Sequence, residues 1–289
     1  MPTPKLLEEE KGILGIMPAY IKSLGAAGVK LISHHERNYI KGLPESMGLI
    51  IYFDPTDGYT LAIMDSAFIT SQRTGAASAV SVKYLARKDS KTVGLIGTGA
   101  LAVSQIEAIC KARKISKVKA YDINPDAMSN FSSKLNVPDL KVEMVNNPQR
   151  ACKGADIIIT CTTSKEPVIH EDFIDKGPHL IGVGADMPHR RELSASVFKL
   201  VDRFVTDLPN QALITGEIRE AISSETITEN EIHNTLGEVV VGDKLGRLEE
   251  DEITIFKSTG MAIQDDAVAK LVYDLAKERG SGLEISITP

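Results

Sequence analysis

The residues from Thr92 to Ala102, TVGLIGTGALA, join a short apolar run to closely spaced glycines. The apolar run suits a buried parallel strand, and it leads directly into Gly97-x-Gly99-x-x-Ala102, after which apolar residues recur at helical spacing. A strand, a tight turn and a helix in this order can hold a pyrophosphate on the free N–H groups at the start of the helix. The sequence therefore predicts a dinucleotide site whose phosphate contacts are Gly97, Thr98, Gly99, Ala100 and Leu101.

A carboxylate stands where such a site would need one. The next apolar segment, 118–121, ends in Asp122, which lies 20 residues after Ala102. In dinucleotide-binding folds an acid at this spacing accepts hydrogen bonds from the ribose of the adenosine half. The alternative is an ordinary strand-to-helix turn followed by a chance acid. No arginine follows Asp122, only Ile123 and Asn124, so we expect NAD rather than NADP as the cofactor.

Outside this motif, the residues that could take part in catalysis or binding give less specific sequence signals. Polar loops follow two predicted strands, at 161–165 and at 182–190, and the second loop contains Asp186. Lys30 stands within a predicted strand, and Arg73 stands within a predicted helix. Strand lysines and helix arginines are usually solvated, and loop aspartates often cap a turn, so the residue types alone leave a functional role and a structural one open.

Strands and helices alternate from Thr92 onward. Asn124-Pro125 and Asn147-Pro148 each match an N-cap followed by proline in the first helical turn. A helical region is expected at 209–222, a loop up to about Asp251, and a helix at 267–278. We predict a doubly wound parallel sheet that binds ligands at the carboxyl ends of its strands, which are 93–96, 118–121, 140–144, 156–160, 179–183 and 204–206. A further strand is expected at 253–256.

The N-terminal part has a different pattern. Strands are expected at 28–33, 48–53 and 59–64, and Asp57-Gly58 marks a tight turn between the last two. A long helix should follow at 67–86. The fold class is therefore α/β, with a Rossmann-type domain beside a smaller antiparallel α+β domain.

Composition agrees with an enzyme that binds small molecules. The chain has 289 residues, is 43% hydrophobic and carries a net charge of −6, which argues against a nucleic-acid partner. No apolar run suits a membrane span or a signal peptide, so a cytoplasmic protein is expected. The three cysteines lack C-x-x-C spacing, so neither a disulfide nor a metal site is expected.

Several local sequences together resemble the ornithine cyclodeaminase and mu-crystallin family. They occur in the family's order over nearly the whole chain, and they are M-P-A-Y at 17–20, G-V-K at 28–30, D-G at 57–58, R-T-x-A-A-S from Arg73, I-G-T-G-A at 96–100, G-A-D-M-P with R-E-L at 184–193, and F-K-S-T-G-M-A-I-Q-D at 256–265.

This resemblance implies a homodimer and a two-domain chain. Residues 1–88 with 266–289 would form the dimerisation and substrate domain, and 89–265 the NAD-binding domain. Lys30 and Arg73 would hold the substrate carboxylate, with Lys30 also near the reacting nitrogen, and Asp186 would move the amine proton. Further cofactor contacts are implied for Thr162, Arg190 and Ser258. Lys5 aligns with an arginine of the family that binds the carboxylate, and a lysine cannot offer the same bidentate fork.

The resemblance leaves the reaction open among the family's activities. NAD-dependent oxidoreduction at the CH–NH group of a small amino or imino acid is our first expectation. The first alternative is ornithine cyclodeamination, which recycles NAD. The second alternative is a non-catalytic, mu-crystallin-like ligand-binding protein. Because such binding proteins lack the aspartate found at 186, an enzyme is favoured. Family members usually begin earlier, so the N-terminus is expected to be truncated or wrongly assigned.

Overall fold

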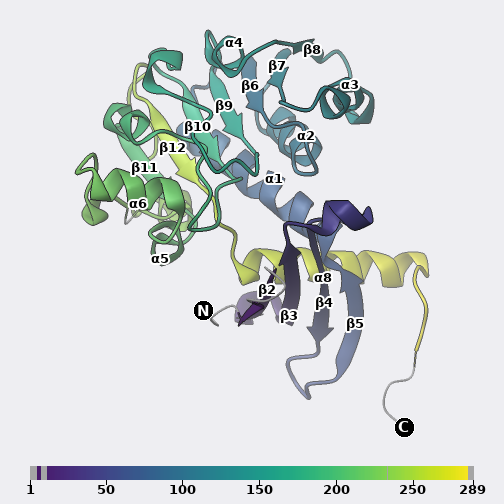
Figure 1. Cartoon of the computed structure of the whole chain (residues 1–289). Helices are drawn as coiled ribbons and strands as arrows, with labels where there is room; N and C mark the ends of the chain where they lie inside the picture. The colour runs from purple at the N-terminus through teal and green to yellow at the C-terminus, as the bar shows by residue number, and fades with distance from the viewer. Residues whose placement is uncertain (1–4, 8–11, 233, 286–289) are drawn as a thin grey trace. The chain divides into compact units, whose positions relative to one another are not determined.

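The structure is a computed structural model that describes residues 5–7, 12–232 and 234–285 (Figure 1). The chain divides into two compact units, Met1–Arg73 with Met261–Pro289, and Thr74–Gly260. These limits differ from the boundaries predicted after residues 88 and 265, because the helix α1 (Ser66–Leu85) begins in one unit and ends in the other. The domain assignment stays a prediction. Each unit has its own sheet, one antiparallel and one parallel, and this confirms the predicted fold class.

The first unit contains a five-stranded antiparallel sheet in the order β1-β2-β3-β4-β5. Residues 12–21 form a long strand that the sequence analysis did not predict, and it pairs along its length with the strand after the turn at Gly25. Short 3-10 turns, η1 (Lys22–Leu24) and η2 (Asn38–Lys41), lie between strands. The strands are β1 (Lys5–Leu7), β2 (Gly12–Ile21), β3 (Ala26–His35), β4 (Ser46–Phe53) and β5 (Thr60–Asp65).

One face of this sheet is covered by α8 (Ala262–Arg279), which packs on β2, β3 and β4 (Figure 1). The small core between them includes Ile50, Ile69 and Ala269. The helix begins earlier than predicted because the side chain of Gln264 accepts a hydrogen bond from the backbone N–H of Met261, at 3.4 Å, and caps the first turn.

The second unit contains a seven-stranded sheet in the order β11-β12-β10-β9-β6-β7-β8. Every pair in it is parallel, so all carboxyl ends lie along one edge. The strand order reverses between β6 and β9, which is where doubly wound sheets bind ligands. The strands are β6 (Thr92–Ile96), β7 (Lys117–Tyr121), β8 (Lys141–Met144), β9 (Ile157–Thr160), β10 (His179–Gly182), β11 (Arg203–Thr206) and β12 (Thr254–Lys257).

Two apolar cores lie on opposite faces of this sheet, because successive strand residues alternate between them. Ile157 and Ile159 belong to one core and Ile158 to the other. The first core includes residues of α1, α2 (Ala102–Ala112), α3 (Pro125–Lys134) and α7 (Leu236–Val241). The second includes residues of α4 (Pro148–Cys152), α5 (Pro209–Ala212), α6 (Gly216–Ser223) and the 3-10 helix η4 (Ala195–Leu200).

Local signals had mixed outcomes. The side chains of Asn124 and Asn147 cap α3 and α4 as predicted. The loop expected up to Asp251 is wrong in part, because it contains η5 (Glu229–Ile232) and α7, whose capping box joins Thr235 and Glu238. All three cysteines are free. Among the described residues, no helix is both long and apolar enough to span a membrane.

Candidate active site

The turn after β6 requires glycine at one position and leaves space at another. Gly97 has a φ of 92°, and a Cβ there would lie 2.6 Å from the carbonyl oxygen of Cys161. At Gly99, by contrast, a Cβ would meet no atom of the described residues within 4 Å. The first glycine therefore lets the turn pack against β9, and the second leaves room for a ligand to approach the backbone.

The N-terminus of α2 presents unused hydrogen-bond donors. Within the described part of the chain, the N–H groups of Gly99, Ala100 and Leu101 donate to no acceptor, and no side chain caps the helix. Gly99 and Ala100 are exposed. Free N–H groups at a helix start attract anions, so these three residues are suited to hold a pyrophosphate.

Asp122 is held beside this turn. Its Oδ2 accepts hydrogen bonds from the backbone N–H of Thr98 at 2.6 Å and from the Thr98 hydroxyl at 3.1 Å. Its Oδ1 accepts from the N–H of Asn124 at 2.9 Å. The carboxylate is thus fixed at the carboxyl end of β7, the position from which it can accept from ribose hydroxyls.

Thr162 and Ser258 also follow strand ends of the same sheet. Thr162 Cγ2 lies 3.0 Å from where a Cβ of Gly97 would be, so this loop borders the glycine turn. The N–H of Ser258 donates to the carbonyl of Gly182 at 3.0 Å, which places Ser258 beside the end of β10. The structure therefore brings the predicted cofactor residues after β6, β7, β9 and β12 to one edge of the sheet.

Asp186 and Arg190 lie together in the loop after β10. Arg190 Nη1 is 3.3 Å from Asp186 Oδ1, and the Asp186 side chain is 41% exposed while that of Arg190 is 8% exposed. A half-exposed carboxylate that faces one guanidinium can still reach a ligand. The arrangement permits the proton transfer that the resemblance implies for Asp186.

Lys30 and Arg73 meet in the first unit on a single carboxylate. Lys30 Nζ lies 3.2 Å and Arg73 Nε lies 3.0 Å from the same oxygen, Oδ1 of Asp265. Lys30 is 1% exposed, Arg73 is 7% exposed and Asp265 is fully buried. Lys30 also donates to the Thr70 hydroxyl at 2.6 Å. The lysine therefore does not lie on a solvated strand face, and its role in substrate binding stays a prediction.

A second carboxylate is buried beside this cluster. Asp266 is fully buried, and neither of its oxygens has a hydrogen-bond partner of normal geometry among the described residues. Burial and, to a smaller extent, the charge of Asp265 raise the pKa of Asp266 to about 7, while the N–H of Gly28 acts in the opposite direction.

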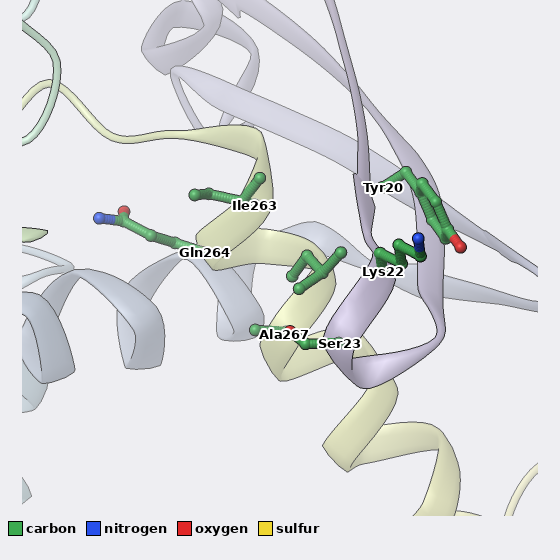
Figure 2. Close-up of a pocket in the computed structure, with 7 residues that line it drawn as sticks. Tyr20, Lys22, Ser23, Ile263, Gln264 and Ala267 are labelled. Atoms are coloured by element: carbon green, nitrogen blue, oxygen red, sulfur yellow. The ribbon is translucent and has the colours of Figure 1, made fainter.

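A pocket of about 910 Å³ opens next to the cluster, between the end of β2 and the first turns of α8 (Figure 2). Gln264, one of its lining residues, accepts a hydrogen bond from Arg73 Nη1 at 3.1 Å. The other lining residues are Tyr20, Ile21, Lys22, Ser23, Ile263 and Ala267. The side chain of Lys5, predicted as a substrate contact, lies outside the described residues.

The sequence analysis missed Asp207, which organises the Ser258 segment. Its carboxylate accepts hydrogen bonds from the Ser258 hydroxyl at 2.9 Å, from the N–H and hydroxyl of Thr259 at 3.0 Å, and from the N–H of Gly260 at 2.7 Å. Asp207 directly follows β11, and an acid at the carboxyl end of a parallel strand is the signal that could have identified it.

Comparisons with known proteins agree with this geometry. The model of the "Ornithine cyclodeaminase/mu-crystallin family" matches residues 2–280. An alanine dehydrogenase of Archaeoglobus fulgidus is 42% identical over 285 residues, which cover 99% of this chain and 87% of that protein.

Two solved structures are similar over almost the whole chain. One is Thermococcus litoralis Delta(1)-pyrroline-2-carboxylate reductase in complex with NADH and L-proline, with a TM-score of 0.93, 39% identity and coverage of 98% of this chain and 88% of that one. The other is an archaeal alanine dehydrogenase dimer with bound NAD. Its TM-score is 0.92 and its sequence identity is 41%, and the match covers 100% of this chain and 88% of that one. These relatives confirm the predictions of the family, of an enzyme and of NAD as its cofactor. The chain belongs to the ornithine cyclodeaminase/mu-crystallin family.

Proposed function

We propose that this protein is an NAD-dependent oxidoreductase that acts on the CH–NH group of a small amino acid or imino acid. One observation carries the substrate class. Lys30 and Arg73 both contact Oδ1 of Asp265 in a buried position, so two cationic side chains converge on one point. A substrate carboxylate would be attracted to these two cations, and the planar guanidinium of Arg73 suits a carboxylate.

The chemistry assigns a task to each proposed residue. NAD, when bound, accepts the hydride from the substrate Cα. Lys30 and Arg73 hold the carboxylate, and Lys30 lies near the amine. Asp186 takes a proton from the ammonium group, so that the nitrogen lone pair can form the C=N bond as the hydride leaves. In reverse, Asp186 returns the proton to the nitrogen as an imine is reduced.

The proposed cofactor contacts are those that surround the glycine turn. The unused N–H groups of Gly99, Ala100 and Leu101 support phosphate binding, and Asp122 supports ribose binding. Gly97, Thr98, Thr162, Arg190 and Ser258 would complete the site. Lys5 stays a predicted substrate contact.

A substrate screen tests the proposal. NADH oxidation would be followed with pyruvate plus ammonia, with cyclic imines and with iminosuccinate, and conversion of ornithine to proline would be measured in parallel. We expect NADH consumption with at least one imino substrate. Proline formation without net NADH consumption would instead support the cyclodeaminase alternative, and NADH binding without any turnover would support the non-catalytic binding protein.

We also propose a homodimer, supported by the sheet face that α8 does not cover. Apolar side chains of β2, β4 and β5 are exposed on this face. In β3, which lies between β2 and β4, Leu31 and Val29 pair with residues of both strands and make the apolar surface continuous. Contiguous apolar patches on soluble proteins mark interaction sites. The exposed members are Leu14, Ile16, Tyr20, Leu49 and Ile63.

Light scattering tests the assembly. We expect the mass of a dimer, and Ile16→Lys, at the centre of the apolar face, should shift the protein towards monomer. A wild-type protein that stays monomeric at high concentration would refute the dimer. The cytoplasmic location expected from the sequence remains a prediction.

A further inference from the structure

A buried cluster of charges lies beneath the loops that follow β9 and β10. It consists of Glu192, Glu217 and Lys257, each of which is fully buried. Lys257 Nζ lies 2.8 Å from Glu217 Oε1. Two carboxylates with a single cation are costly to bury unless other donors satisfy them, so their partners indicate what the cluster does.

Among the described residues, every hydrogen-bond donor to the Glu192 carboxylate belongs to one of the two loops or to the strand β9. Oε1 accepts from the N–H of Thr162 at 2.6 Å. Oε2 accepts from the N–H groups of Gly184 and Ala185, at 2.8 and 3.1 Å, and from the Thr160 hydroxyl at 2.9 Å. A single carboxylate thus joins the Thr162 loop to the residues that directly precede Asp186.

Glu217 fixes Glu192 in turn. Its Oε2 accepts from the backbone N–H groups of Glu192 and Leu193, at 2.8 and 3.0 Å, and its other oxygen faces Lys257. Lys257 ends β12, one residue before Ser258, so the cluster reaches a third strand end. The three residues therefore connect α6, the 182–193 segment and β12.

The loops are also packed too closely to move independently. A Cβ at Gly184 would lie 2.1 Å from the carbonyl oxygen of Thr162 and 2.5 Å from Glu192 Oε1. The glycine allows the two loop backbones to touch, and the Glu192 carboxylate fills the space below them. A shift of one loop would thus be transmitted to the other.

We propose that Glu192 is a positioning residue, which holds the Asp186 loop and the Thr162 loop in the register needed for catalysis, and that Glu217 and Lys257 keep Glu192 in place. This inference rests on the proposed function for the role of Asp186. Glu192 itself contacts neither substrate nor cofactor in this scheme. It acts through the backbone of residues 162, 184 and 185.

Glu192→Gln is the sharpest test because it keeps the shape and removes acceptors. An amide has one acceptor oxygen, so its NH₂ group would face either the N–H of Thr162 or the three donors at Oε2. We expect kcat to fall on the order of 10- to 100-fold because a small misplacement of a reacting group has an effect of that size. The primary isotope effect with deuterated NADH should rise.

The matched control is Glu166→Gln, the same chemical change in the neighbouring loop, where the side chain is 82% exposed. It should leave kcat and the isotope effect unchanged. Thr160→Val serves as a milder variant that removes one donor to Glu192 without charge, and it should lower kcat by a few-fold with an unaltered melting temperature. A purely structural role would reduce only the fraction of active protein, as counted by NADH binding, and would leave kcat per bound site unchanged.

Hydrogen exchange followed by mass spectrometry separates this inference from the proposed function. In Glu192→Gln, peptides that contain residues 160–165 and 183–190 should exchange faster than in the wild type and in Glu166→Gln. This result supports the positioning role even if no substrate is found, an outcome that would count only against the proposed function. The positioning role of Glu192 would be overturned by unchanged hydrogen exchange in both segments. It would also be overturned if Glu192→Gln and Thr160→Val had the kcat and the isotope effect of the wild type.

Discussion

The two units bury charged residues in opposite ways. Around Asp265 in the first unit, the charged partners are the cationic side chains of Lys30 and Arg73, which contact the same carboxylate oxygen. Around Glu192 in the second unit, the partners are backbone N–H groups and a hydroxyl, and they occupy both carboxylate oxygens. The first cluster has charge to offer a ligand, whereas the second has its hydrogen-bonding capacity committed to the protein.

This difference indicates what each buried charge does. Cations that share one oxygen of an aspartate can also contact a substrate carboxylate, because the aspartate holds both side chains in place and uses only some of their donors. A carboxylate that accepts several backbone hydrogen bonds cannot leave them without freeing the loops that donate them. Ligand binding is expected in the first case and loop positioning in the second.

The largest expected effect comes from Lys30→Met, which keeps the apolar stem and removes the charge. Because this variant loses both the carboxylate contact and the charge near the amine, kcat/KM should fall on the order of 10³-fold, through KM and kcat together. Steady-state kinetics on the best substrate would measure this. The control is Lys41→Met, an exposed lysine of the same unit. Values within about twofold of the wild type would remove Lys30 from the site.

A smaller but more selective effect is expected from Asp186→Asn, which preserves shape but cannot accept the amine proton. We predict a decrease in kcat on the order of 10²-fold, with NADH affinity nearly unchanged, since the residue acts on the chemical step. Stopped-flow kinetics and NADH fluorescence titration would separate the two quantities. Asp172→Asn, an exposed aspartate of the same unit, is the control. An equal loss of NADH binding would show that Asp186 supports the cofactor instead.

The cofactor residues could be predicted from the sequence because their signal is local. A strand-turn-helix pattern identifies Gly97, and a fixed spacing after it identifies Asp122. Because the strands are parallel, the loops that follow them lie at the same edge of the sheet. The burial of Lys30 could not be predicted in this way. It depends on which face of β3 is covered by α8, and Asp265 of that helix is 235 residues away in sequence.

The same reasoning explains the other omissions. Glu192 belongs to the R-E-L motif, but its role depends on backbone donors from two loops, and periodicity contains no information on these contacts. The Thr235–Glu238 capping box, by contrast, was visible in the sequence, and the helix α7 could have been predicted from it. Tertiary contacts therefore account for the omission of Glu192, whereas Asp207 had a local signal at the end of its strand.

Cofactor preference should change moderately when Asp122 is replaced. Its carboxylate would repel a 2′-phosphate, so the wild type should prefer NADH to NADPH. Asp122→Ser removes the charge and should raise the ratio of kcat/KM for NADPH to that for NADH by about tenfold. Asp126→Ser, four residues later and exposed, should leave the ratio unchanged. A wild type that already uses NADPH as well as NADH would contradict this role of Asp122.

The smallest expected effect concerns Asp266, a buried acid of the first unit whose carboxyl oxygens have no hydrogen-bond partner of normal geometry among the described residues. Burial, together with the charge of Asp265, raises its pKa to about 7, well above the ordinary value of 3.8. Between these two pH values the folded protein holds a proton that the unfolded chain releases. The free energy of unfolding should therefore decrease as the pH rises from about 4 to 7, and the destabilisation is complete above pH 7.

The asparagine side chain in Asp266→Asn is neutral at every pH and nearly the same size as aspartate. The free energy of unfolding of this variant should therefore not decrease with the ionisation of residue 266. Its melting temperature should exceed that of the wild type by roughly 2 °C or more at pH 8, and the difference should shrink towards pH 5. The control, Asp274→Asn, removes an exposed acid of α8 that pairs with Lys270 at 2.7 Å, and it should not gain stability at any of these pH values. A difference between Asp266→Asn and wild type that stays constant from pH 5 to pH 8 would contradict this prediction, because it would mean that Asp266 does not change its protonation state in this range.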